Sequence, residues 1–327
     1  MESPDTQTDP GPEGSAPPAD VSASAPPPGA QDLAAGGVPA GGLTGTTPRH
    51  DDDIPQDADD NRGKHFRALL GNKWVLGLTW VCGIAALIIG TTQAGIGIGL
   101  AALGVVLVIA LIIVFAIANS RAADDFFNAY AQGRGLTRID GRSSLPPVTP
   151  LLRKGDKRYA VEAFRGTLPG GLAGTLALYT YEEKSRDADG DERTTYYKFT
   201  VVLAQLPETA PFIGELEVQR RFGFRFLDGF EDFFRTRQRV ELESEAADRR
   251  FEIFIGKNDD MNRARQIFSP SFIVWLAEEA HEKIAFELVG GALVVNVPGH
   301  KKSARELDEF CEAASVIARR LHDEATE

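Results

Sequence analysis

One long apolar stretch dominates the pattern of hydrophobic and polar positions along this chain. The 47 residues of the segment 74–120 contain no Asp, Glu, Lys or Arg. One bilayer crossing takes about 20 apolar residues, because a helix rises about 1.5 Å per residue and the hydrocarbon core is about 30 Å thick. The stretch is therefore long enough for two crossings. Its polar segment 91–93 predicts a tight turn between membrane helices at about 74–91 and 95–118.

The basic residues on either side of this stretch predict its orientation. Cytoplasmic flanks of membrane helices collect Lys and Arg. The polar segment between the two expected helices carries none, whereas both outer flanks carry several: Arg62, Lys64, Arg67 and Lys73 before the stretch, and Arg121, Arg134, Arg138 and Arg142 after it. We therefore expect a multi-pass protein of the cell (inner) membrane, with the N-terminus and the C-terminal domain both cytoplasmic.

Small residues at the start of the second expected helix have two interpretations. The motif G-x-G-x-x-A within residues 94–102 resembles a dinucleotide fingerprint, but that fingerprint needs a preceding strand and a soluble helix, which a bilayer excludes. Gly95, Gly99 and Gly104 instead predict close helix packing. This packing could lie within the hairpin or between copies in a homo-oligomer, and we favour the hairpin.

The first 62 residues differ in composition from the rest of the chain. They are rich in Pro, Gly, Ala, Ser and Asp, and residues 1–60 hold twelve acidic residues against Arg49 alone. Such a segment is typical of disorder. Its acidic run 51–53 is expected to be a solvated linker, with a cation or basic-partner site as the alternative. Because the chain carries −12 in total, the remainder is nearly neutral, and we expect no nucleic-acid partner.

The chain thus divides into four expected segments. An acidic tail (1–62) is followed by a transmembrane hairpin (63–119), a juxtamembrane helix and linker (120–139), and a cytoplasmic domain (140–327). The juxtamembrane helix carries aromatic residues on one side: Phe126, Phe127 and Tyr130. These side chains could rest at the lipid headgroups or dock onto the domain that follows, and we favour docking.

The cytoplasmic domain shows strand and helix patterns that occur in separate runs. Strands rich in Val, Thr, Tyr and Leu are expected at 174–183, 194–206, 215–227, 251–256, 284–289 and 292–297, with a Gly290-Gly291 hairpin between the last two. Ser269-Pro270 predicts the start of a helix over 271–283. Ser303 with Glu306 predicts the cap of an amphipathic C-terminal helix with an apolar stripe: Leu307, Phe310, Cys311, Ala314, Ile317, Ala318 and Leu321. Without βαβ alternation, this pattern favours a membrane-anchored α+β fold with an antiparallel sheet.

Motifs for chemistry are weak throughout the cytoplasmic domain. The acidic segment 187–192 lacks the glycine and glutamate spacing of a calcium loop. His281 belongs to neither a complete H-E-x-x-H motif nor a repeated E-x-x-H motif. Segment 221–226 (RFGFRF) faintly resembles an RNA-binding strand, although core packing of its phenylalanines explains it better. We therefore assign no catalytic, cofactor-binding or metal-binding residue and expect no cofactor.

Two features together resemble a known family. The two-helix hairpin and the segment 251–298, with Asp260, Arg265 and Ser269-Pro270-Ser271-Phe272, are similar to the DUF3137 family of bacterial two-pass membrane proteins. The resemblance covers about residues 65–320 and is specific over the last third. It supports the architecture and implies no catalytic residue, because the family has no established activity.

Two functions from different classes are compatible with these patterns. The preferred one is a non-catalytic interaction or scaffold module that presents its α+β domain at the lipid bilayer to a protein partner, a lipid or a second copy. The alternative is a membrane-tethered enzyme whose site combines dispersed residues near 259–281: Asp259, Asp260, Arg263, Arg265 and His281. A channel is less favoured, because two helices without an intramembrane charge provide no ion pathway unless several chains assemble.

Overall fold

The structure is a computed structural model. It describes residue 57 and the ranges 62–71, 73–186, 190–220, 237–242 and 244–327. Nearly all of the predicted acidic tail lies outside the described residues, as do the motif 221–226 and the segment 187–189.

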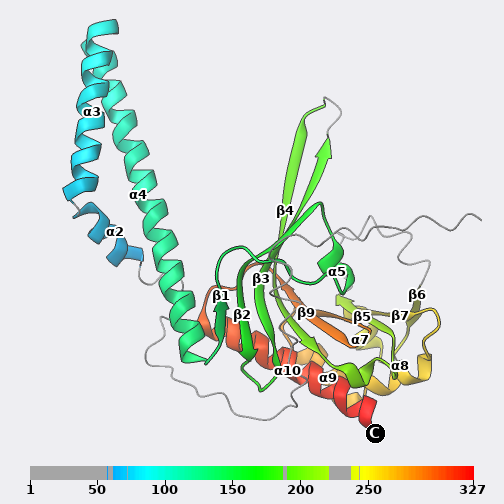
Figure 1. Cartoon of the computed structure of the whole chain (residues 1–327). Coiled ribbons are helices and arrows are strands. Elements are labelled where there is room, and N and C mark those ends of the chain that lie inside the picture. Colours follow the sequence, from blue (N-terminus) through cyan, green and yellow to red (C-terminus); the bar gives the residue numbers. More distant parts are fainter. Residues whose placement is uncertain (1–56, 58–61, 72, 187–189, 221–236, 243) are drawn as a thin grey trace, which may run out of the picture.

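In the described ranges, three helices precede the first strand: α2 (Arg62–Leu70), α3 (Lys73–Ala94) and α4 (Ile96–Gly133). Figure 1 shows α3 and α4 side by side, projecting far beyond the sheet. Among the described residues, α4 is the one helix long and apolar enough to cross a bilayer. Helix α3 adds a shorter apolar stretch, Thr79–Thr92.

The predicted turn between these helices is wrong in position. Thr91 and Thr92 are helical, and each hydroxyl donates a hydrogen bond of 2.9 Å to the carbonyl of Ile88. These bonds keep the polar side chains satisfied inside the helix. The break falls at Gly95, whose φ of 95° favours glycine.

Close packing of α3 and α4 depends on Gly99, as predicted, but not on Gly95 or Gly104. A Cβ atom on Gly99 would lie 2.9 Å from the Leu87 carbonyl oxygen, whereas a Cβ on Gly95 or Gly104 would meet nothing within 4 Å. The partner glycine is Gly90, where a Cβ would lie 2.7 Å from the Gly99 Cα. Gly99 therefore packs within the hairpin.

Helix α4 continues without a break into the α+β domain. Phe126, Phe127 and Tyr130 are buried in the main core, and the rings of Phe127 and Phe164 lie 5.8 Å apart. The prediction that these aromatics dock onto the domain is confirmed. The helix ends at Gly133, and a buried ion pair follows at once, between Arg134 and Asp308 of the last helix.

The domain is built on one antiparallel sheet with the strand order β1-β2-β3-β4-β9-β8-β5-β7-β6. The strands are β1 (Thr137–Ile139), β2 (Lys157–Thr167), β3 (Ala173–Arg186), β4 (Glu192–Gln205), β5 (Glu215–Arg220), β6 (Arg237–Val240), β7 (Phe251–Gly256), β8 (Ala285–Val289) and β9 (Ala292–Pro298). The β3–β4 and β8–β9 hairpins are confirmed. Strands β1, β2 and β6 had no clear pattern in the sequence.

The other helices that the structure describes are short, except for the last. They are α5 (Pro150–Arg153), the 3-10 turn η1 (Pro207–Thr209), α7 (Glu245–Arg250), α8 (Met261–Ile267), α9 (Pro270–Glu278) and α10 (Ala304–Thr326). The predicted caps are confirmed, because Ser269 accepts from the Phe272 amide and Ser303 from the Glu306 amide. The apolar stripe of α10 is buried as predicted.

The two faces of the sheet are covered differently. Alternate residues of a strand point to opposite faces. Val202 and Val295 join the large core under α4, α9 and α10, whereas Leu203 and Val294 join a smaller core with Leu152 of α5. Figure 1 shows α9 and α10 at the end of the protein opposite the tips of α3 and α4.

Candidate functional site

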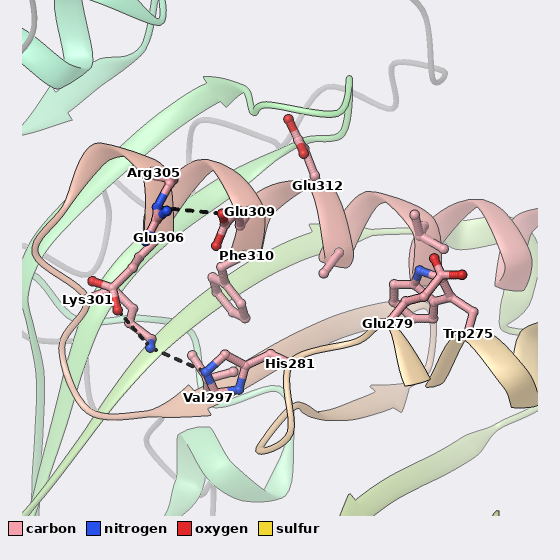
Figure 2. A pocket seen from close by; sticks show the side chains of 12 residues that line it. Trp275, Glu279, His281, Val297, Lys301, Arg305, Glu306, Glu309, Phe310 and Glu312 are labelled. Carbon is pink, nitrogen blue, oxygen red and sulfur yellow. Dashed lines mark hydrogen bonds and ion pairs between the residues drawn. The ribbon is translucent and has the colours of Figure 1, made fainter. Parts of the chain in front are cut away.

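A groove lies between the C-terminal end of α9 and the first turns of α10. Its volume is about 540 Å³, which falls within the range of binding clefts. Apolar side chains line part of it, among them Val297 of β9, Phe310 of α10 and Trp275 of α9. Figure 2 shows Trp275 and Glu279 at one end, with Lys301, Arg305 and Glu306 at the other.

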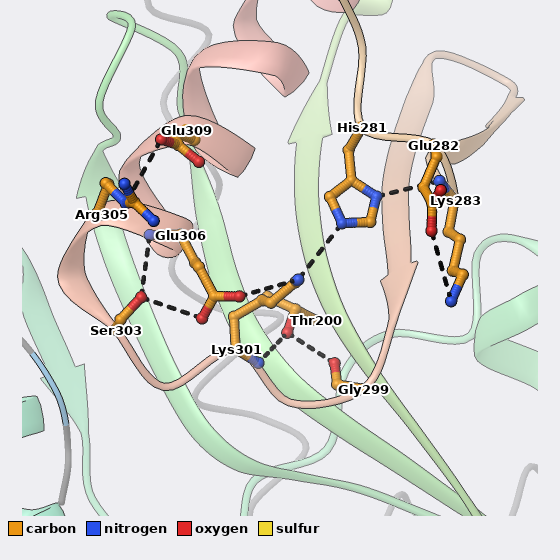
Figure 3. Close-up of polar contacts among 10 residues, drawn as sticks. All are labelled: Thr200, His281, Glu282, Lys283, Gly299, Lys301, Ser303, Arg305, Glu306 and Glu309. Carbon is orange, nitrogen blue, oxygen red and sulfur yellow. Dashed lines mark hydrogen bonds and ion pairs between the residues drawn. The ribbon is translucent and has the colours of Figure 1, made fainter.

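The basic end of the groove is held by the loop that leads into α10. The Thr200 hydroxyl donates to the Gly299 carbonyl at 2.9 Å and accepts from the Lys301 amide at 2.8 Å. The Ser303 hydroxyl donates to the Glu306 carboxylate, and the Lys301 ammonium lies 3.2 Å from the same carboxylate (Figure 3). Lys301 is therefore a fixed cation at the mouth of the groove.

His281 faces this cation from the loop after α9. Its Nδ1 accepts a hydrogen bond of 3.0 Å from the Lys283 amide, and its Nε2 lies 3.4 Å from the Lys301 Nζ. Burial and the charge of Lys301 lower the pKa of His281. A ring with one nitrogen occupied and the other facing an ammonium group is poorly placed to act as a general base.

The predicted helix over 271–283 is thus too long. Helix α9 ends at Glu278, and the Ala280 amide bonds back to the Trp275 carbonyl. His281 is therefore not on a helix, and the helical spacing from Glu278 does not apply to it.

Carboxylates dominate the rim of the groove. Glu306 pairs with Lys301, and Glu309 lies 3.8 Å from Arg305, one helical turn away. Glu279 and Glu312 are exposed and have no ion-pair partner in the described part of the chain. The groove therefore combines an aromatic floor with an excess of negative charge.

The residues of the alternative enzyme site have separate structural roles. Asp259 accepts from the backbone amides of Gly214 and Glu215, each at 2.9 Å, which ties the loop after β7 to the start of β5. Asp260 caps α8 by accepting from the Asn262 amide. Arg263 donates to the Pro211 carbonyl at 3.2 Å.

These residues do not meet His281. Asp259 binds the start of β5, whereas the His281 carbonyl accepts from Arg220 at the other end of that strand. A strand rises about 3.3 Å per residue, so the two ends of this six-residue strand are about 17 Å apart. Arg265 is exposed on α8. Of the five residues of the alternative enzyme site, Asp259 therefore lies at the start of β5 and His281 at its other end, and no common site is formed.

A buried polar cluster on the opposite face of the sheet had not been predicted. Glu217 of β5 and Glu287 of β8 are direct cross-strand partners, and both are buried. Arg237 of β6 forms an ion pair with Glu217 and a second one, of 3.2 Å, with Glu215. Glu287 accepts from the Leu151 amide at 3.0 Å and so holds the α5 segment against the sheet.

Burial and mutual repulsion change the protonation of this pair. Burial and the charge of Glu287 raise the pKa of Glu217 to about 8, against the opposing effect of Arg237. Burial raises the pKa of Glu287 as well and lowers that of Lys154. Two carboxylates this close cannot both ionise without penalty, so they retain a proton near neutral pH.

The sequence contained one signal for this cluster. In the strand 285–289 (AFELV), Glu287 stands between Phe286 and Leu288 in an otherwise apolar run. A charge at such a position is seldom buried without a partner. The partner strands β5 and β6 could not be assigned to it, because their pairing is not local in the sequence.

Two kinds of reactive group would indicate chemistry near the groove and the core, a metal cluster and an activated thiol. No group of three or more His, Cys, Asp or Glu side chains that could hold a metal ion occurs within the described ranges. Cys311 is fully buried in the α10 stripe, and burial raises the pKa of its thiol. A buried thiol with a raised pKa is a poor nucleophile.

Comparisons with known proteins give no independent assignment of this groove. No protein family, no curated protein and no solved structure matches the chain.

Proposed function

We propose that this protein is a two-pass inner-membrane protein that presents a non-catalytic binding domain to a cytoplasmic protein partner. In this proposal α3 and α4 both cross the bilayer, and the partner binds in the groove between α9 and α10. The observation that carries the proposal is the course of α4, a single helix that is apolar at its start and buried in the domain core at its end.

The exposed apolar side chains support insertion of both helices. All but three of the exposed large apolar side chains in the described ranges lie on α3 and α4. Ile88 of α3 is 55% exposed and Ile112 of α4 is 61% exposed. In water such a surface would be costly, whereas in lipid it needs no cover.

The composition of the groove indicates the chemistry of the partner. An exposed Glu279 beside Trp275, with Glu309 and Glu312 across the groove, suits a Lys or Arg side chain. Aromatic faces attract such cations, and neighbouring carboxylates add charge complementarity. The partner in this proposal is therefore a protein segment that carries basic and apolar side chains.

Reporter fusions test the two-pass topology. We expect green fluorescent protein fused after Glu327 to fluoresce and alkaline phosphatase at the same site to be inactive, because the C-terminus is cytoplasmic. The same pair of fusions at the N-terminus should give the same result. If the two termini report opposite sides of the membrane, α4 alone crosses it and the two-pass topology is wrong.

Photo-crosslinking in native membranes tests the groove. With a photoreactive amino acid at Glu312, we expect one protein partner to be recovered in a discrete adduct. Glu279→Lys should reduce the adduct by about five- to tenfold, because it repels a basic segment beside Trp275. Glu278→Lys, its exposed neighbour outside the groove, is the matched control and should leave the yield unchanged.

Two results would contradict this binding mode. Recovery of the protein itself alone would indicate a homo-oligomer instead of a partner complex. An equal loss of adduct in Glu278→Lys and Glu279→Lys would show that the groove is not the contact.

A further inference from the structure

Helix α2 is fixed against α4 at the cytoplasmic end of the apolar stretch. Its His65 Nε2 lies 2.6 Å from an Asp125 carboxylate oxygen, and the rings of Phe66 and Phe115 are 6.2 Å apart. Leu69 packs with Val114 and Ala118 of α4. Helix α2 therefore lies beside residues 114–125, where the uncharged run of α4 ends (Figure 1).

Three basic side chains remain exposed at this junction. Lys64 and Arg67 of α2 are three positions apart and so share one face of the helix, and Arg121 is the first charged residue after the apolar stretch of α4. None of the three forms an ion pair with any residue that the structure describes. We call Lys64, Arg67 and Arg121 the basic collar.

The nearest carboxylates on α4 are already engaged. Asp124 pairs with Arg138 at 3.0 Å, and Asp125 pairs with His65. Arg138 also binds Glu162 of β2 at 2.8 Å, so these charges are held against the domain. Asp124 and Asp125 of α4 therefore do not neutralise the positive charge of the basic collar.

We propose that the basic collar binds the headgroups of anionic phospholipids in the inner leaflet. This inference rests on the membrane insertion in the proposed function, which places Arg121 and α2 at the level of the headgroups. Exposed Lys and Arg next to a membrane helix are attracted to anionic lipid surfaces, by about fivefold in affinity for each residue. The collar lies open on the surface, so it suits the headgroups of lipids that surround the helices.

Native mass spectrometry of the full chain in a neutral detergent tests the proposal. Phosphatidylglycerol and phosphatidylcholine with identical acyl chains are the probes. We expect the protein to bind phosphatidylglycerol at least about tenfold more tightly, and this preference to weaken as the salt concentration rises. Lys64→Gln/Arg67→Gln/Arg121→Gln should abolish the preference, whereas Lys64→Arg/Arg67→Lys/Arg121→Lys should keep it.

A matched triple variant separates the collar from total charge. Lys157→Gln/Lys257→Gln/Lys302→Gln removes the same charge from exposed sites on the cytoplasmic domain and should leave the preference intact. Free glycerol 3-phosphate should not displace the lipid, and displacement would assign the collar to a soluble phosphate compound instead.

The inference is overturned if the collar variant keeps the preference, or if both triple variants lose it equally. Equal binding of the two lipids by the unmodified chain would also overturn it. Failure of the proposed membrane insertion gives a different result, because the protein would then be absent from the membrane fraction altogether.

Discussion

Asp308→Ala is expected to destabilise the α+β domain by about 3–5 kcal/mol, because it removes the carboxylate from a buried guanidinium. Asp308 accepts from the Tyr130 hydroxyl at 3.0 Å and from two nitrogens of Arg134, at 3.1 and 2.5 Å. The side chains of Arg134 and Asp308 are only 4% and 6% exposed. The measurement is the denaturant dependence of Cys311 labelling in a Cys82→Ser background, since Cys311 is buried beside this pair.

Two further variants make this prediction specific. Glu309→Ala, one residue along α10, removes an exposed carboxylate that lies 3.8 Å from Arg305, and should change stability by no more than about 0.5 kcal/mol. Arg134→Met/Asp308→Leu should recover much of the loss of the single variant, because it replaces both charges by apolar groups. Equal stability of Asp308→Ala and Glu309→Ala would contradict the anchoring role of this ion pair.

Glu217→Gln is expected to stabilise the protein above neutral pH and to flatten its pH dependence. The pKa of Glu217 is raised from 4.5 to about 8, so the folded state keeps a proton that the unfolded state has lost between these values. This contribution is fully present below about pH 4.5 and is lost as the pH rises towards 8. Glutamine mimics the protonated form, and we expect a gain of about 3 kcal/mol at pH 8.5.

The thermal unfolding midpoint of the detergent-solubilised protein, measured from pH 5 to 9, checks this expectation. Glu215→Gln is the control, since Glu215 lies on the same strand and also pairs with Arg237, but its side chain is 44% exposed. Its pH profile should run parallel to that of the unmodified protein. A parallel profile for Glu217→Gln would mean that the buried carboxylate pair shares no proton.

Local signals predicted the parts of the fold that depend on neighbouring residues. Ser303 with Glu306, Ser269-Pro270 and Gly290-Gly291 each fix a helix cap or a turn within a few positions, and all three lie where the sequence indicated. The turn between α3 and α4 was misplaced because Thr91 and Thr92 look like turn residues but bond to carbonyls in their own helix.

Long-range pairing explains what the sequence could not predict. Strand β4 pairs with β9, almost 100 residues later, and β5 lies between β7 and β8. Only this order brings Glu217, Arg237 and Glu287 together. The groove depends on the same strand order, because the loop after β9 places Lys301 next to His281. Asp308 fits the polar face of α10 in sequence and acquires its partner only when α4 docks.

In the proposed topology, the uninterrupted course of α4 also sets the height at which the domain stands below the bilayer. From Ser120 to Gly133 the helix advances only about 20 Å, and the buried Arg134–Asp308 ion pair ties its base to α10. In that topology we expect each copy to hold its domain at a similar distance from the bilayer. A ligand that is itself tethered to the lipid would search a thin layer instead of the whole cell volume, which raises its local concentration without any added contact.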